Sequence, residues 1–335
     1  MIKAKLIEGL LSGKYQNVLH PEVALRPIDI KGNIFNQEPV IHYLNEHPRL
    51  LQGFKPIDDY SHGIVIGMTS ENNIVKIAFK NNLIVKIVFE EKNPSIRRIK
   101  LTLEYDGTNY AGFQRQSTLD TVQLRLETAL LEMTARQIVI YGASRTDAGV
   151  HAYGQVVHFD TELSIPDDKW VIALNNLLPK DIRIKTAETV SQLFHSRFDV
   201  VSKEYRYVLN LGEFSPFTRF YEWTVPYTFD IEILKQEIKK IEGTFDFTSF
   251  CKGDKESKVR TIYSTSVTQE NEKIILTFIG NGFLHNMIRI LVMALINIAS
   301  KRIDADILTI LEAKNRNLTK QLAPSCGLYL VKVNY

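Results

Sequence analysis

Alternating and helical apolar patterns after residue 95 predict two successive units with the same order of elements. In the first unit, Ile99, Leu101, Leu103 and Tyr105 alternate with polar positions, which predicts a strand. A helix is expected to follow, with Asp120 as N-cap, Gln123 three residues on, and an apolar stripe at Val122, Leu126, Ala129, Leu130 and Met133. The other expected elements are strands near 137–141 and 154–160, a helix near 167–177 and a strand near 181–189. This β-α-β-β-α-β order is that of a ferredoxin-like unit.

The same order recurs after residue 200. Strands are expected near 203–210, 261–268, 273–280 and 327–333, with an extra strand near 220–225. Helices are expected over 231–242, with Gly243 as its C-terminal signal, over 285–299, and after Asp304. We therefore predict an α+β fold: two tandem ferredoxin-like units that form a mixed, mostly antiparallel sheet with a central cleft.

The first 95 residues are predicted to form a separate small α+β domain. Helices are expected over 3–11 and 37–46, and two similar alternating strands meet at Lys80–Asn82 as a hairpin. The polar stretch Glu90–Ser95 contains Pro94 and is typical of a linker. The predicted domains are therefore 1–95, 96–200 and 201–335. The first resembles a reduced cystatin-like or NTF2-like fold, and its expected role stays open between RNA binding, a dimer contact and neither.

Composition narrows the class of protein. Of the 335 residues, 44% are apolar and 24% charged, as in ordinary globular proteins. The longest apolar run, Ile290–Ile296, is too short to span a bilayer, and no secretory leader pattern opens the sequence. Cys251 and Cys326 lie far apart, and the eight histidines do not cluster, so we expect a cytoplasmic protein without a disulfide framework or a metal. The net charge of +3 does not by itself argue for nucleic-acid binding.

The segment Tyr141–Ala152 is the candidate for chemistry. It places Arg145 and Asp147 two residues apart among small residues, between two predicted strands. One interpretation is a surface ion pair on a hairpin connection, which contributes little. The other is a carboxylate nucleophile in a cleft, because a neighbouring guanidinium favours the ionised form that burial disfavours. A covalent aspartyl intermediate divides one difficult substitution into two easier steps.

This segment resembles the catalytic motif of the TruA family of tRNA pseudouridine synthases, whose pattern is G-x-x-R-T-D-x-G-V-H-A. Further segments resemble the family in the same order along residues 97–335: Leu103–Gln116, Thr121–Gln123, Ala173–Pro179, Phe194–Asp199, Lys203–Tyr207, Gly243–Phe250, Phe283–Arg289 and Gly327–Val331. Each motif alone is weak, but the ordered set is specific. Two departures stand out: Ala323–Gly327 has Cys326 where the family often has histidine, and the first 95 residues are foreign to the usual family architecture.

The resemblance implies a role for each matching residue. Asp147 is then the nucleophile, Arg145 occupies the space left by the flipped base, Tyr205 stacks on the uracil, Arg289 pairs with Asp147, and Leu328 walls the pocket. Without the resemblance, Tyr205 and Leu328 are ordinary core residues. Arg289 differs from them, because a guanidinium in an apolar helix needs a partner.

Two further groups are candidates for substrate binding. The loop Gly107–Gln116 mixes glycine with aromatic, amide and basic side chains, namely Tyr110, Phe113, Gln114 and Arg115. Such a loop can stack on bases and hold phosphates, although a surface turn without a ligand fits its composition equally well. His151 lies close to the catalytic motif, and its alternative role is structural.

The resemblance implies a cofactor-free and metal-free isomerase that acts on tRNA, at uridines on the 3′ side of the anticodon stem-loop, and works as a homodimer. The C1′–N1 bond breaks, the uracil turns over, and C5 bonds to C1′. Whether Asp147 attacks C1′ or C6, or assists elimination, stays open. The alternative function is an RNA-binding protein of the same fold without catalysis. A hydrolase with an aspartate nucleophile is disfavoured, because no second carboxylate stands nearby in the sequence.

Overall fold

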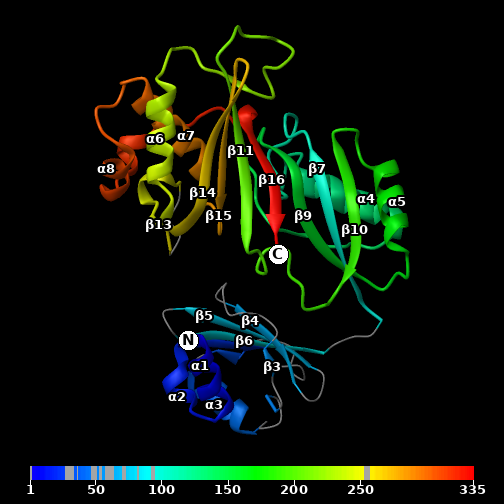
Figure 1. Cartoon of the computed structure of the whole chain (residues 1–335). Helices are drawn as coiled ribbons and strands as arrows, with labels where there is room; N and C mark the ends of the chain where they lie inside the picture. The colour runs from blue at the N-terminus through cyan, green and yellow to red at the C-terminus, as the bar shows by residue number, and fades with distance from the viewer. Residues whose placement is uncertain are drawn as a thin grey trace. The chain divides into compact units, whose positions relative to one another are not determined.

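The computed structural model describes residues 2–26, 34–35, 37–46, 51–52, 55–56, 64–69, 73–80, 83–91, 95–252 and 257–335. The chain forms two compact units (Figure 1). The first contains Met1–Arg98, Thr161–Ser164 and Val190–Asp199. The second contains Ile99–Asp160, Ile165–Thr189 and Val200–Tyr335. The halves that the sequence suggested, 96–200 and 201–335, thus contribute to a single large unit.

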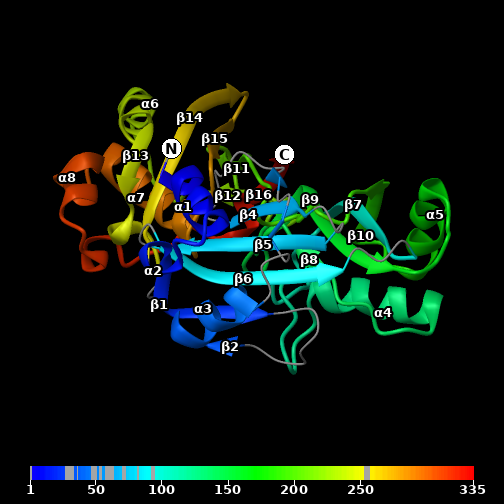
Figure 2. The ribbon, with the colours of Figure 1, turned by 90° about the horizontal axis from the view of Figure 1, so that it is seen from below.

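The first unit pairs three helices with a sheet whose strand order is β2-β1-β6-β5-β4-β3 (Figure 2). The helices are α1 (Ile2–Leu11), α2 (Tyr15–Val18) and α3 (Gln37–Glu46). The strands are β1 (Leu19–Arg26), β2 (Ile34–Phe35), β3 (Lys55–Pro56), β4 (Ile64–Met68), β5 (Asn73–Lys80) and β6 (Leu83–Glu91). Its core contains Leu10, Val40, Leu44, Ile77 and Ile87.

This unit confirms the two helices and the antiparallel hairpin that the N-terminal pattern predicted. α3 buries Val40 and Leu44 and packs against β1, as its apolar stripe requires. β5 and β6 pair in antiparallel fashion along their length. The expected turn at Asn81 and Asn82, and the linker residues Lys92–Pro94, lie outside the described residues.

The second unit is built on a ten-stranded sheet of order β10-β7-β9-β16-β11-β15-β14-β13, with β8 paired to β9 and β12 to β11 (Figure 1). Its first half consists of β7 (Arg97–Tyr105), α4 (Val122–Thr134), β8 (Tyr141–Gly142), β9 (His151–Thr161), α5 (Asp167–Leu177) and β10 (Ile182–Val190). The second consists of β11 (Ser202–Asn210), β12 (Trp223–Thr224), α6 (Ile231–Lys240), β13 (Gly243–Asp246), β14 (Val259–Glu270), β15 (Lys273–Gly280), α7 (Met287–Ala299), α8 (Ile307–Glu312) and β16 (Leu328–Asn334). The α+β class with a mostly antiparallel sheet is thereby confirmed.

Three local predictions need correction. Thr121, not Asp120, caps α4, because its hydroxyl accepts from the Leu124 amide while Asp120 pairs with Arg125. The strand expected at 137–141 shrinks to β8 at Tyr141–Gly142. Gly243 does not merely end a helix: it opens β13, a strand that the apolar pattern did not predict.

β16 joins the two halves of the large sheet. It runs antiparallel to β11, with Tyr207 opposite Leu328, and parallel to β9, with Tyr329 opposite His151. The last strand of the chain therefore lies between the first strand of the second half and the strand that follows Asp147. This arrangement brings residues more than a hundred positions apart in sequence to one place.

Candidate active site

The loop that carries Asp147 connects β8 to β9 and is shaped by its glycines. The Val150 amide donates to the Asp147 carbonyl at 3.1 Å, and Gly149 adopts a positive φ of 73°. From the loop that follows β7, the Phe113 amide donates to the Thr146 carbonyl at 3.1 Å. Gly112 approaches the same carbonyl so closely that a Cβ there would lie 2.6 Å from its oxygen. The two loops are therefore packed backbone against backbone.

Buried neutral hydrogen bonds hold the residues that precede Asp147. Gln155, fully buried on β9, accepts from the Ser144 amide at 3.2 Å and donates to the Ser144 carbonyl at 2.7 Å. The Tyr105 hydroxyl and the Thr146 hydroxyl are hydrogen bonded at 2.7 Å. One buried amide thus satisfies both backbone groups of Ser144, and a buried phenol holds the residue next to Asp147.

A guanidinium and an imidazole flank the Asp147 carboxylate, which is 23% exposed. Nη1 of Arg289 lies 3.5 Å from Oδ2, and Nε2 of His285 lies 3.5 Å from Oδ1. The Arg289 guanidinium is 18% exposed, and its Nε donates to the Ala323 carbonyl at 2.7 Å. At 3.5 Å the contacts with Asp147 are ion pairs rather than short hydrogen bonds. The carboxylate therefore keeps oxygen lone pairs for a reacting atom.

Tyr205 lies on β11, in the middle of the sheet, and is 5% exposed. Its hydroxyl is hydrogen bonded to the Ser144 hydroxyl at 2.8 Å, and its ring meets the Phe283 ring edge-on at 5.2 Å. The β11–β16 register shifts between Glu204 and Tyr205, an irregularity that re-aims side chains. Burial raises the pKa of Tyr205 to about 12; the hydrogen bond from Ser144 opposes this rise, and the Asp147 charge adds to it.

Arg145 and Leu328 differ in exposure to solvent. The Arg145 side chain is exposed, on the loop between Ser144 and Asp147. Leu328 is buried at the start of β16, opposite Tyr207. Just before it, a Cβ on Gly327 would lie 2.8 Å from the Tyr207 ring, so this corner is closely packed.

The loop Gly107–Gln116 divides its candidate residues between interior and surface. Tyr110 is buried and its hydroxyl donates to Asp181, while the Phe113 ring is buried and stacks near Tyr105 at 6.4 Å. Gln114 and Arg115 are exposed, and Arg115 forms an ion pair with Glu127 at 2.9 Å. The aromatic rings therefore support the loop from inside, and the polar pair faces solvent.

His151 is 2% exposed at the start of β9. Its Nδ1 accepts from the Gly107 amide at 3.1 Å, and its Nε2 lies 2.8 Å from the Phe220 carbonyl. A carbonyl only accepts, so the neutral ring carries its proton on Nε2. Burial lowers the pKa of His151, although the Phe220 carbonyl and Asp106 oppose that shift. The ring thus links the loop after β7 to β9, the strand that follows the Asp147 loop.

Sequence reasoning missed three residues of this site: Ser144, Gln155 and His285. Ser144 lies inside the catalytic motif, but its type gave no reason to expect a contact with Tyr205. Gln155 is a polar side chain within an apolar strand, and such a residue signals a buried hydrogen-bond partner. His285 precedes α7, which begins at Met287, and Asn286 between them has a left-handed backbone, so helical spacing does not predict its contact with Asp147.

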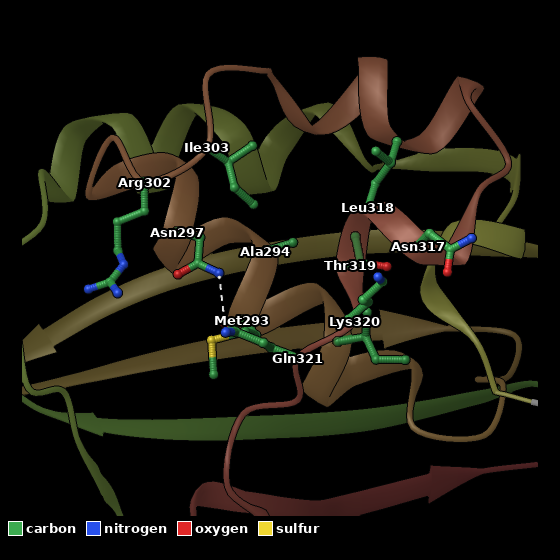
Figure 3. A pocket seen from close by; sticks show the side chains of 11 residues that line it. Met293, Ala294, Asn297, Arg302, Ile303, Asn317, Leu318, Thr319, Lys320 and Gln321 are labelled. Atoms are coloured by element: carbon green, nitrogen blue, oxygen red, sulfur yellow. Dashed lines mark hydrogen bonds between the residues drawn. The ribbon is translucent and has the colours of Figure 1, made fainter.

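A pocket of about 340 Å³ lies along α7, beside these residues rather than among them (Figure 3). Ile290, Met293, Ala294 and Asn297 form one wall, about a quarter turn around the helix from Arg289. Across it, the Asn297 amide points to Gln321, with a separation of 3.5 Å. The residues that line this pocket differ from those that surround Asp147.

Comparisons with known proteins agree on one family. A family model described as tRNA pseudouridine synthase matches residues 102–199 and 238–335. A protein from Anoxybacillus flavithermus named tRNA pseudouridine synthase A is 48% identical over 244 residues, which cover 72% of this chain and 99% of that protein. A protein of the same name from an Exiguobacterium species is 45% identical over 243 residues, which cover 72% of this chain and 98% of that protein.

A solved structure described as an NTF2-like protein of unknown function, from Cytophaga hutchinsonii, is also similar to part of the chain. It covers 27% of this chain and 95% of its own, at 13% identity and a TM-score of 0.21. A likeness of this size carries no argument about the fold. The cystatin-like or NTF2-like fold expected for residues 1–95 therefore stays a prediction.

Proposed function

This chain belongs to the tRNA pseudouridine synthase family, and from that premise we propose that it isomerises uridine to pseudouridine in tRNA, with Asp147 as the nucleophile. The relatives match along almost their whole length, and the family motif Gly142–Ala152 is complete. The observation that carries the role of Asp147 is its place between Arg289 and His285. The Arg289 guanidinium lies 3.5 Å from one oxygen of the carboxylate that would attack, and the His285 ring lies 3.5 Å from the other.

The neighbouring residues support a flipped-base reaction. Extruding a base from a stack costs a few kcal/mol in general, and the exposed Arg145 is placed to fill the gap that it leaves. Tyr205 offers a buried ring from β11, and Leu328 lies on the neighbouring strand β16, opposite Tyr207. Arg289 pairs with Asp147 and, through Ala323, ties α7 to the segment before β16.

The remaining roles concern RNA contacts. Gln114 and Arg115 face solvent and would contact the RNA backbone, whereas Tyr110 and Phe113 hold that loop in shape from within. His151 acts through the same loop, by its hydrogen bond with Gly107. These residues therefore position the substrate-binding surface rather than change the chemistry.

The finer assignments follow from the family. We propose uridines on the 3′ side of the anticodon stem-loop as targets, a homodimer as the working form, and the cytoplasm as the place of action. In the described part of the chain, no helix has both the length and the apolar character to cross a membrane.

The decisive experiment measures turnover and position together. The purified protein is incubated with tRNA labelled with tritium at uridine C5, and tritium release is followed, since each isomerisation loses the C5 hydrogen. Pseudouridine is then mapped in tRNA from cells with and without the gene. Release of tritium and loss of anticodon-stem pseudouridine from the deleted strain are expected. Tight tRNA binding without release would favour the catalytically inactive RNA-binding protein instead.

A further inference from the structure

The hydrogen bond between Ser144 and Tyr205 connects the two halves of the active site. It joins the loop that carries Asp147 to the central strand β11, across 61 positions of sequence, at 2.8 Å. The contact joins two hydroxyl groups, and either of them can be the donor. A residue of the loop that carries Asp147 is therefore hydrogen bonded to a buried tyrosine of the other half.

The Ser144 side is held firmly. Both of its backbone groups are bonded to the fully buried Gln155. The preceding residue, Ala143, donates to Val156 at 2.8 Å and accepts from the Lys203 ammonium at 2.7 Å. Since β9 and β11 both contribute to this anchoring, the Ser144 hydroxyl has little freedom to move away from Tyr205.

The Tyr205 side is held equally firmly. The residue is paired on both edges of β11, to Phe278 on β15 and to Leu330 on β16. Phe283 closes on the ring edge-on. The position of the phenol oxygen is therefore determined by the sheet, and its hydroxyl shares a hydrogen bond with Ser144.

We propose that Ser144 is a positioning residue of the isomerisation, which orients the Tyr205 hydroxyl and accepts its proton while Tyr205 removes the proton from C5 of the turned uracil. This inference rests on the proposed function. The C5–H bond breaks, its electron pair forms the C5–C6 double bond, the π electrons of the C6–N1 double bond move to N1, and N1 takes up a proton from water. The C5 proton goes to the Tyr205 oxygen, the phenol proton to the Ser144 oxygen, and the serine proton to water. No electron is gained or lost.

Because Tyr205 is buried, it needs an acceptor for its own hydroxyl proton. With its pKa raised to about 12, Tyr205 stays a neutral phenol at neutral pH and accepts a proton only if it gives up its own. Ser144 is the hydrogen-bond partner of its hydroxyl and is partly exposed, so it has access to water. The pair thus provides both an acceptor for the C5 proton and a route by which a proton reaches water.

The test compares Ser144→Ala with Ser144→Thr, and uses Ser266→Ala, on the exposed face of β14, as a matched control. Single-turnover tritium release should fall about 10- to 100-fold in Ser144→Ala, less than the usual 10²- to 10⁴-fold for an acid–base group itself, because Tyr205 remains in place. Binding of tRNA should stay within about two-fold of wild type. Ser144→Thr keeps a hydroxyl and should recover most of the rate, and Ser266→Ala should equal wild type.

A second arm separates a proton path from mere packing. Replacing hydrogen by deuterium at C5 should slow Ser144→Ala more than wild type, because C5–H cleavage then limits the rate. In a Tyr205→Phe background, Ser144→Ala should cause no further loss, since the two residues act as one unit. Additive losses, or a Ser144→Ala rate equal to wild type, would overturn the inference and leave the proposed function intact. A wild-type protein that releases no tritium would overturn both.

Discussion

The two halves of the large sheet contribute to the site by different physical means. The first half holds Asp147 by short neutral contacts: Gln155 with Ser144, Tyr105 with Thr146, and backbone packing against Gly112. The second half brings the charged Arg289 guanidinium and the His285 ring to the carboxylate, each at 3.5 Å. One half therefore determines where the carboxylate is, and the other determines the electrostatic field around it.

The two kinds of contact respond differently to substitution. A short buried hydrogen bond depends on geometry, and its loss leaves an unsatisfied group that costs about 1–3 kcal/mol. An ion pair at longer range tolerates small displacements but is lost when the charge is removed. Variants on the two halves should accordingly change position in one case and charge in the other.

The largest effect is expected for Asp147→Asn. The amide keeps the shape of the side chain and removes both the nucleophile and the negative charge, so tritium release from tRNA should fall by at least on the order of 10³-fold. Binding of tRNA should stay within a few-fold, as measured by filter binding. Substantial turnover by the folded variant would remove Asp147 from the nucleophile role.

A smaller loss is expected for Arg289→Met, which removes charge from the second half and keeps apolar volume in α7. Tritium release should fall on the order of 10- to 100-fold, because Asp147 loses the guanidinium beside it. Arg289→Lys keeps the charge and loses the planar group that also donates to Ala323, so its rate should be intermediate. Equal rates for the two variants would show that charge is not what Arg289 contributes.

His151 sharpens the comparison through pH. Burial lowers the pKa of His151 in the folded protein, so the unfolded chain binds the proton more readily. Stability should therefore be complete above the pKa of a free histidine and be lost as pH falls through the lower folded value. The drop in Tm from pH 7.5 to pH 5 should be smaller in His151→Gln, on the order of 2–4 °C, which corresponds to about 1 kcal/mol in a domain of this size.

An equal pH dependence in the two proteins would mean that His151 does not titrate on unfolding. His195 offers a control from the other unit, because burial also lowers its pKa, to about 4. Its contribution to acid sensitivity should persist in His151→Gln.

The smallest effect on chemistry is expected from removal of residues 1–95. Every residue that the site uses lies between Tyr105 and Leu328, and the relatives match over 243 or 244 residues, 72% of this chain. A chain that starts at Ile96 should retain tritium release within a few-fold when the two are compared at equal concentration. Soluble protein without activity would show that the first unit contributes to the site.

The order of elements and the motif could be predicted from the sequence for a clear reason. Alternation along β7 and the apolar stripe of α4 are local patterns, and burial confirms them except at Met133, which is only partly buried. Where the local signal was ambiguous, the prediction was wrong: Asp120 and Thr121 are both good caps, and the chain used Thr121. β13 escaped because a four-residue edge strand has too short a pattern to recognise.

The sequence by itself determined which residues are chemically competent. The types and spacing of Arg145 and Asp147, and the position of Arg289 in an apolar helix, can be recognised from the sequence alone. Only the tertiary structure decided which of them meet. β16, inserted between β9 and β11, brings Tyr205 to Ser144. α7 brings Arg289 to Asp147, and the segment before α7 brings His285 there. It also decided that Tyr110, Phe113 and His151 are buried supports, since exposure depends on what the rest of the chain places over a side chain and is not encoded in its type.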